Sequence, residues 1–170
     1  MVRFIKCAAA SATAAMLCFA GAANAQARDP YVRLTSEYLG TGMALDVGQI
    51  SPTNNNWWAA MGPTGTGSGQ LWYFAPLGGN QYRMSNQYNG LNACLDVHAE
   101  GTLYMDACGN QIGQRWIVQG QPGAIAITNA LVPGHCLDVI STGAHQVAML
   151  TPCANLTGQR WTLHNTGIYP

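Results

Sequence analysis

Three aspartates and three glutamines recur in matching motifs along this chain of 170 residues. Each aspartate is the third letter of ALDV or CLDV, and each glutamine is the second letter of GQLW or GQRW. Carboxylate and amide groups accept and donate hydrogen bonds to vicinal hydroxyls, which is the chemistry of sugar recognition. The repeated polar residues are Asp46, Asp96, Asp138, Gln70, Gln114 and Gln159.

These residues also have structural alternatives. An aspartate can cap its own turn by accepting hydrogen bonds from nearby N–H groups. A glutamine can hold the backbone of a hairpin, and we favour that role over a sugar contact. The tryptophans that close the glutamine motifs, Trp72, Trp116 and Trp161, recur once per motif beside apolar neighbours, so we expect them to fill a core.

The elements that must position these residues are three copies of one unit. The tryptophans lie 44 and 45 residues apart, and a strand-like run precedes each LDV segment. Short apolar runs bounded by glycine, proline and asparagine predict strands, and no helical period is evident. The pattern predicts an all-β barrel or sandwich built from three pseudo-symmetric units of about 45 residues.

Four cysteines remain when the two within the first 25 residues are set aside. Four cysteines allow three disulfide connectivities. The repeat favours pairing within a unit, because the first unit has lost both partners together and has Ala44 and Thr64 in their places. A zinc site is the alternative, but the chain has no CxxC pair. The favoured disulfides are Cys94–Cys108 and Cys136–Cys153.

The first 25 residues have the layout of a secretory signal peptide. Arg3 and Lys6 precede an alanine-rich apolar run, and the segment ends in a small-x-small pattern at 23–25. We expect cleavage to leave residues 26–170 as one secreted or periplasmic domain. The alternative is an N-terminal anchor that stays attached.

Charge narrows the range of partners. Residues 26–170 hold five arginines and seven acidic residues, without a cationic cluster. Binding to nucleic acid or to an anionic membrane surface needs such a cluster, so neither is expected. Beyond the N-terminal run, no segment has the ~20 apolar residues of a membrane span. The expected partner is therefore neutral and polar.

Catalysis is not expected. Glycoside hydrolysis needs two carboxylates about 5 to 9.5 Å apart, and a threefold arrangement separates the repeated aspartates. Asp96 with Asp106 is the one candidate pair, and nothing in the sequence marks either as a general acid. The histidines are scattered without metal-ligand spacing, so no metal or other cofactor is expected.

Three LDV segments in register with three QxW motifs and two cysteine pairs resemble the ricin-B-type β-trefoil lectin domain. The resemblance covers about residues 31–169, in units at about 31–80, 81–123 and 124–170. It implies a six-stranded barrel closed at one end by three hairpins, with up to three shallow sugar pockets. It also implies that the repeated aspartates occupy the family's sugar-binding position.

The chain departs from this family pattern at two places in every unit. Sugar-binding members usually have an aromatic residue two places before the second cysteine, and commonly have asparagine before the QxW glutamine. Neither feature is kept here, which argues against galactose-type binding in the usual geometry. The aromatic places hold Gly62, Asp106 and Thr151, and the asparagine places hold Gly69, Gly113 and Gly158.

Other residues offer substitutes in the second unit. Tyr104 and Asp106 are two residues apart on a predicted strand, so their side chains share one face. With Asp96 and Gln114 they form a candidate carbohydrate pocket that has two carboxylates and an aromatic ring.

The first unit is the richest in aromatic residues. Trp57 and Trp58 follow three asparagines, and one of two adjacent strand residues must point outward. We expect that indole to accompany Asp46 and Gln70, and the alternative is that both indoles wedge under the long first-unit loop. The third unit ranks last because its hairpin has no aromatic residue, and it offers Asp138, His145 and Gln159.

Together these features predict a secreted, lectin-like carbohydrate-binding module with partly degenerate pockets. It would bind a neutral glycan in a manner that depends on Asp96 or Asp46, weakly at each site and more strongly through several sites together. The alternative is a protein-interaction trefoil without sugar binding, such as a toxin delivery subunit or an inhibitor-like protein. The recurring aspartates favour the first, and the missing aromatic residues favour the second.

Reduction should lower the melting temperature of the oxidised protein. Two disulfides constrain the unfolded chain, and loss of a native disulfide typically costs about 2–5 kcal/mol. Differential scanning fluorimetry with and without reductant measures the change. Titration of residues 26–170 under denaturing, non-reducing conditions should find no free thiol, and a result of four free thiols would rule the disulfides out.

Overall fold

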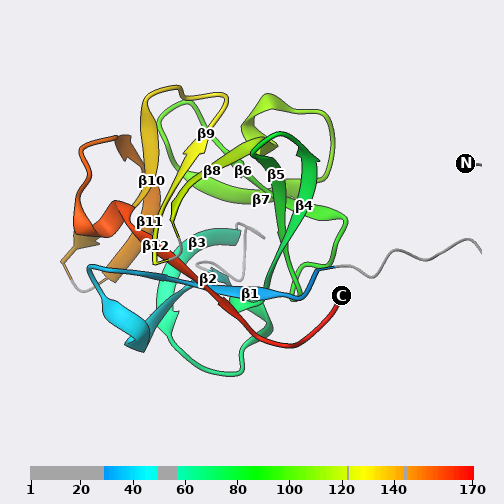
Figure 1. Cartoon of the computed structure of the whole chain (residues 1–170), viewed down its shortest axis with the longest axis horizontal. Coiled ribbons are helices and arrows are strands. Elements are labelled where there is room, and N and C mark those ends of the chain that lie inside the picture. The colour runs from blue at the N-terminus through cyan, green and yellow to red at the C-terminus, as the bar shows by residue number, and fades with distance from the viewer. Residues whose placement is uncertain (1–28, 50–56, 122, 144) are drawn as a thin grey trace, which may run out of the picture.

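The computed structural model describes residues 29–49, 57–121, 123–143 and 145–170, which form a closed all-β structure (Figure 1). The strands fall into three consecutive sets of four. The first set is β1 (Val32–Ser36), β2 (Met43–Gln49), β3 (Trp57–Pro63) and β4 (Trp72–Gly78). The second is β5 (Gln81–Asn86), β6 (Ala93–Val97), β7 (Leu103–Ala107) and β8 (Trp116–Gln121). The third is β9 (Ala124–Asn129), β10 (His135–Thr142), β11 (His145–Pro152) and β12 (Trp161–Asn165).

The outer strands of each set form a six-stranded barrel. In order around it, β12 pairs with β1, β1 with β4, β4 with β5, β5 with β8 and β8 with β9. A pairing of Trp161 with Ile125, between β12 and β9, completes the circle. Because the barrel closes, these six strands leave no unpaired sheet edge.

The inner strands of each set form three hairpins, β2–β3, β6–β7 and β10–β11. The hairpins also pair with one another. Val147 of β11 pairs with Ala60 of β3, and β3 in turn pairs with β7. A bridge between Thr102 and Met149 joins the second hairpin to the third. The predicted all-β trefoil, with its barrel and three hairpins, is thereby confirmed.

The core centres on three indole rings that are fully buried. Each tryptophan begins the last strand of its set, and its Nε1–H donates to the carbonyl oxygen of the leucine in the same set's LDV segment. A buried indole needs such a partner, because an unmet N–H in an apolar core is costly. The donor–acceptor distances are 2.9 Å for Trp72–Leu45, 2.9 Å for Trp116–Leu95 and 2.8 Å for Trp161–Leu137.

Both favoured disulfides are confirmed, and each joins the first strand of one hairpin to the residue that follows the second strand. The bridged residues are 14 and 17 positions apart in sequence, with Cα atoms 4.9 and 5.0 Å apart. The pairs are Cys94–Cys108 and Cys136–Cys153.

In the first unit, Thr64 takes the place of the second cysteine. Its backbone N–H donates to the carbonyl oxygen of Gly42 at 3.0 Å. In the other units the N–H of Cys108 donates to Asn92 and that of Cys153 to Gly134, both at 2.9 Å. Its hydroxyl donates to the carbonyl oxygen of Thr41 at 2.7 Å. A side-chain hydrogen bond therefore joins the segment before β2 to the residue after β3 in the unit that has no disulfide.

The proposed signal segment, residues 1–25, lies outside the described residues, as do Asn54, Asn55 and Asn56. The backbones of Trp57 and Trp58 belong to β3, but their side chains are also outside the description. Within the described ranges, no helix is long and apolar enough to cross a membrane.

Replacing Trp116 by phenylalanine should lower the free energy of unfolding by roughly 2–5 kcal/mol, because the Leu95 carbonyl loses its indole donor and the smaller ring leaves a void. Ile112→Ala is the control, since Ile112 is 49% exposed in a neighbouring turn and should change stability by less than about 0.5 kcal/mol. Urea unfolding followed by circular dichroism measures both. Equal midpoints for the two variants would contradict a structural role for the indole N–H.

Candidate functional site

The three repeated glutamines each hold the end of a hairpin. Gln114 is fully buried, and its Nε2 donates to the carbonyl oxygen of Ala107 at 2.9 Å. Its Oε1 accepts from the backbone N–H of Gly109 at 2.8 Å. Both ends of the amide are thus bonded to the chain that leaves the hairpin. The corresponding backbone partners are Pro63 and Gly65 for Gln70, and Pro152 and Ala154 for Gln159.

The repeated aspartates lie beside these glutamines. Asp96 and Asp138 are 3% and 4% exposed, and Asp46 is half-buried. In the second and third units one carboxylate oxygen, Oδ1, accepts from the N–H of the following valine, at 2.8 Å for Asp96 and 2.7 Å for Asp138. In the first unit Oδ2 of Asp46 accepts from Nε2 of Gln70 at 2.9 Å. Each carboxylate therefore supports its own unit.

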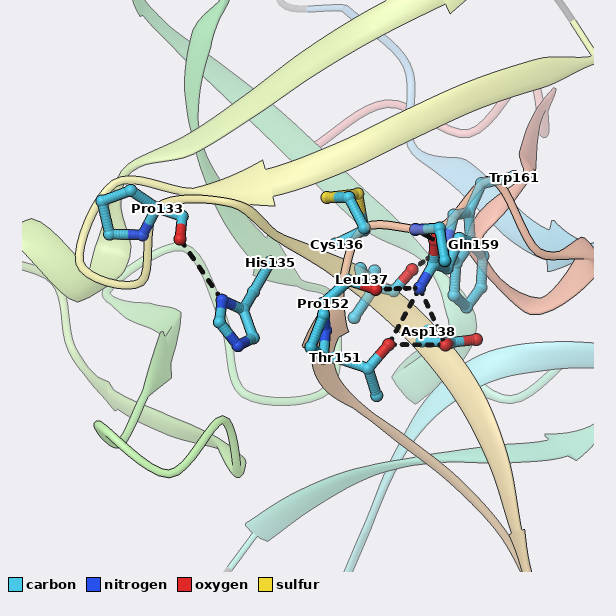
Figure 2. The surroundings of a disulfide bond; sticks show 11 residues. Pro133, His135, Cys136, Leu137, Asp138, Thr151, Pro152, Gln159 and Trp161 are labelled. Carbon is cyan, nitrogen blue, oxygen red and sulfur yellow. Dashed lines mark hydrogen bonds between the residues drawn. A yellow bond between two sulfur atoms is a disulfide. The ribbon is translucent and has the colours of Figure 1, made fainter.

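Asp138 accepts three hydrogen bonds from described residues, more than Asp46 or Asp96 accepts from them (Figure 2). Its Oδ2 accepts from the hydroxyl of Thr151 at 2.6 Å and from Nε2 of Gln159 at 3.1 Å. Figure 2 shows these three side chains turned toward one another beside the indole of Trp161. Thr151 stands at the family's aromatic place, so the residue that replaced the ring now anchors the aspartate.

The glycine before each QxW glutamine explains where the aspartates point. A Cβ added at Gly69, Gly113 or Gly158 would lie only 2.1–2.2 Å from Oδ1 of that unit's aspartate. The carboxylate therefore uses the space that an amide side chain would need. Because only a glycine leaves this space free, the absence of asparagine allows the aspartate to turn inward. The sequence alone did not indicate this relation.

The second-unit residues are brought together only in part. Asp96 pairs across β6–β7 with Tyr104, and Cys94 with Asp106. Asp106 is exposed, and its Oδ1 accepts from the N–H of Ala107 at 2.7 Å. One face of the Tyr104 ring is stacked on His98, with centroids 4.1 Å apart, a contact that the sequence did not predict.

The environment of Tyr104 keeps its hydroxyl protonated. Burial raises the pKa of Tyr104, and the nearby carboxylates Asp96, Asp106 and Glu100 raise the pKa further. A raised tyrosine pKa means that the neutral form persists to higher pH, so the phenol remains a donor.

The third unit, ranked last from the sequence, borders a recess of about 490 Å³. We call it the third-unit pocket. It has an aromatic residue after all, because Tyr38 reaches it from the segment after β1 in the first unit. Tyr38 is 51% exposed, which leaves ring surface available to a ligand. The pocket is lined by Tyr38, Asp138, Val139, Ile140, Asn155, Leu156, Thr157, Gly158 and Arg160.

Two contacts place Tyr38 there. The backbone N–H of Tyr38 donates to the carbonyl oxygen of Thr157 at 3.2 Å. The N–H of the preceding residue, Glu37, donates to the carbonyl oxygen of Arg160 at 2.9 Å. The Arg160 guanidinium also donates two hydrogen bonds to the Glu37 carboxylate. Nε donates to Oε2, and Nη2 donates to Oε1 at 2.9 Å. The first and third units are therefore joined beside the pocket. His145 is exposed at the far end of the β10–β11 hairpin and does not line it.

The same junction recurs at the other two unit boundaries. The backbone N–H of Gln87 donates to the carbonyl oxygen of Leu71. The N–H of Ala130 donates in the same way to the carbonyl oxygen of Arg115. Both bonds match the one from Glu37 to Arg160. The residues after Glu37, Gln87 and Ala130 are therefore equivalent. They are Tyr38 beside the third unit, Tyr88 beside the first and Leu131 beside the second. A sequence signal existed in the segments SEYLG and NQYNG, which share this tyrosine.

No group of three or more histidine, cysteine, aspartate or glutamate side chains that could hold a metal occurs among the residues that the structure describes. The arrangement offers hydrogen-bonding groups and aromatic faces for binding.

Comparison with known proteins supports the same reading of the fold. The family described as the ricin-type beta-trefoil lectin domain matches residues 30–161. No curated protein matches the chain in sequence.

Solved structures of other trefoils are similar at low sequence identity. The designed threefold-symmetric protein ThreeFoil is 23% identical with a TM-score of 0.66, and the match covers 81% of this chain and 99% of ThreeFoil. The Polyporus squamosus lectin, solved with a human-type influenza-binding epitope, is 19% identical with a TM-score of 0.66. The match covers 82% of this chain and 50% of the lectin chain. The Haemophilus ducreyi cytolethal distending toxin is 23% identical with a TM-score of 0.61, covering 80% and 83%.

Replacing Gly69 by alanine should destabilise the protein by roughly 1–3 kcal/mol, because its Cβ displaces the Asp46 carboxylate and disturbs the bond to Gln70. Gly67, two residues earlier in the same loop, is the matched control. A Cβ at Gly67 meets nothing within 4 Å, so Gly67→Ala should stay within about 0.5 kcal/mol of wild type. Thermal unfolding compares the two, and equal melting temperatures would refute the steric argument.

Proposed function

The chain belongs to the ricin-type β-trefoil lectin family, a family of carbohydrate-binding modules, and on that premise we propose that it binds a neutral glycan in the third-unit pocket. The observation that supports this choice is Tyr38, a half-exposed ring that lines one recess with the family's aspartate, Asp138. The volume of about 490 Å³ is within the usual range for small-ligand sites, about 300–1,000 Å³.

The pocket supplies the two kinds of contact that a sugar needs. A tyrosine ring offers an apolar face to the C–H side of a pyranose. Hydrogen-bonding groups surround it, since Asn155, Thr157 and Arg160 also line the recess. These side chains provide an amide, a hydroxyl and a guanidinium, which donate to sugar oxygens, and the amide and hydroxyl also accept from sugar hydroxyls.

Asp138 contributes less than its counterpart in a fully open site would. An ionised carboxylate has about four acceptor positions, and three are taken by Val139, Thr151 and Gln159. One acceptor position remains for a sugar hydroxyl. We therefore propose that each site binds a sugar weakly. The overall affinity rises when several sites bind to one glycan-bearing surface at the same time.

The first unit is proposed as the second site. Tyr88 occupies the position equivalent to Tyr38, is 54% exposed, and follows the residue that bonds to the first unit's QxW motif. Asp46 is half-buried and is the most accessible of the three aspartates. Leu131 stands at this position beside the second unit, so that unit lacks the aromatic contact from its neighbour. The dependence on Asp96 or Asp46 predicted from the sequence stays a prediction.

A protein-interaction role is the second candidate, and the inward-turned aspartates favour it. Asp96 and Asp138 are almost fully buried, and exposed apolar side chains such as Leu156 border the third-unit pocket. On either proposal the protein acts by binding rather than catalysis, and is secreted or periplasmic after loss of its first 25 residues.

Tyr38→Ala should weaken binding of the best neutral glycan at least tenfold, because the pocket loses its aromatic face. Tyr169→Ala is the control, since Tyr169 is 63% exposed near the C-terminus and lines no pocket described above. A glycan array with oxidised protein selects the glycan, and calorimetry compares the two variants. If the folded protein binds no neutral glycan on the array, the lectin proposal fails and the protein-interaction role replaces it.

A further inference from the structure

A second recess lies where the first and second units meet, on the outer surface of the barrel. Its floor consists of paired residues from β4 and β5, Tyr73 opposite Ser85 and Ala75 opposite Arg83. Strand alternation explains this set, because the residues between them, such as the fully buried Met84, point into the barrel. We call this recess the seam recess.

Its wall is covalently braced. Leu91, Asn92, Cys94 and Cys108 line the side opposite the barrel, and the last two form the disulfide of the second hairpin. Cys108 also donates its backbone N–H to the carbonyl of Asn92. The recess measures about 340 Å³, which is within the usual range for small-ligand sites, about 300–1,000 Å³.

Arg83 gives the seam recess a positive charge without a neutralising partner. Its Nη2 donates to Oδ1 of Asn110 at 3.1 Å, a bond that leaves the net charge in place. Among the residues that the structure describes, no carboxylate lines the recess. Within the described part of the chain, the ion pair that the structure contains joins Arg160 to Glu37, not Arg83 to an acid.

The other unit boundaries show that this arrangement is specific to one seam. At the boundary between the third and first units, Arg33 stands at the position of Arg83, but its Nη2 donates to the carbonyl of Gly65 at 2.7 Å. Thr35, equivalent to Ser85, is hydrogen-bonded to His164 at 2.9 Å. At the boundary between the second and third units the arginine position holds Ala126. Arg33 and Arg83 thus each donate to a neutral oxygen. Of the three boundaries as the structure describes them, the first is the one where such an arginine shares its strand pair with a tyrosine ring.

From this geometry we propose that the seam recess binds a carboxylate-bearing sugar, of the uronic or sialic acid class. The planar guanidinium of Arg83 matches a carboxylate in a two-point contact. Tyr73 supplies a ring face for the sugar, and Ser85 and Asn92 supply a hydroxyl and an amide for its hydroxyl groups. This acidic-sugar site is separate from the third-unit pocket and does not depend on neutral-glycan binding there.

The experiment titrates ¹⁵N-labelled, oxidised protein with sodium D-glucuronate, and with D-glucose at matched ionic strength. Glucuronate should cause saturable shifts in the backbone amides of Tyr73, Ser85 and Asn92, and glucose should not. Arg83→Gln should weaken glucuronate binding at least tenfold, because the two-point contact with the carboxylate is lost. Arg115→Gln, which removes an exposed arginine outside the recess, should change it less than twofold. N-acetylneuraminate then tests the sialic acid class at the same amides.

Three results would overturn the proposal. Equal shifts with glucose would show that the carboxylate is not recognised. Glucuronate shifts confined to the amides around Tyr38 would place the acid in the third-unit pocket. Equal affinity for hexaglutamate peptide would show a site for acidic peptides rather than sugars. Failure of the neutral-glycan proposal appears separately, as an absence of shifts around Tyr38 with neutral glycans, and leaves the shifts at the seam recess unaffected.

Discussion

The hydrogen bond from each buried indole N–H to the leucine carbonyl of LDV is the contact on which the rest of this structure depends. It joins a barrel strand to a hairpin strand of the same set, and it is made three times with nearly equal length. Because the indole and the leucine are both fully buried, the bond forms in a region of low dielectric, where an unmet donor would be costly. Once the tryptophan is held in this way, the glutamine two residues earlier reaches the hairpin end.

The consequence for function comes through the aspartate between that leucine and the following valine. The glycine before the QxW glutamine leaves a space beside this aspartate, and the carboxylate turns into that space. A larger residue in place of the glycine would clash with the carboxylate. There it bonds to backbone or side-chain donors of its own unit. The same residue cannot be fully committed to these bonds and fully open to a ligand. A carboxylate oxygen that accepts a hydrogen bond from its own unit has fewer acceptor positions left for a sugar hydroxyl.

The two recesses proposed as binding sites lie at boundaries between units. The third-unit pocket is lined by Tyr38 from one unit and Asp138 from another, and the seam recess by Tyr73 from one unit and Asn92 from the next. The buried tryptophan and the leucine and valine of LDV are identical in the three units, since each set must fill the same space around the barrel axis. The boundary residues face solvent and are under no such packing constraint. They differ accordingly, with Tyr38, Tyr88 and Leu131 at one position and Arg33, Arg83 and Ala126 at another.

The threefold repeat, the trefoil, the buried tryptophans, the hairpin role of the glutamines and both disulfides were predictable from the sequence. These features follow from residues that repeat at a fixed interval and interact within one unit, so a local pattern records them. The tertiary structure was needed to show that Tyr38 lines a recess with Asp138, and that Arg83 lies beside Tyr73. Tyr38 and Asp138 are separated by two unit boundaries in sequence, and barrel closure between β12 and β1 brings them together. A contact made by barrel closure joins residues that are far apart in the chain, so no local spacing in the third unit indicates that Tyr38 lies beside Asp138.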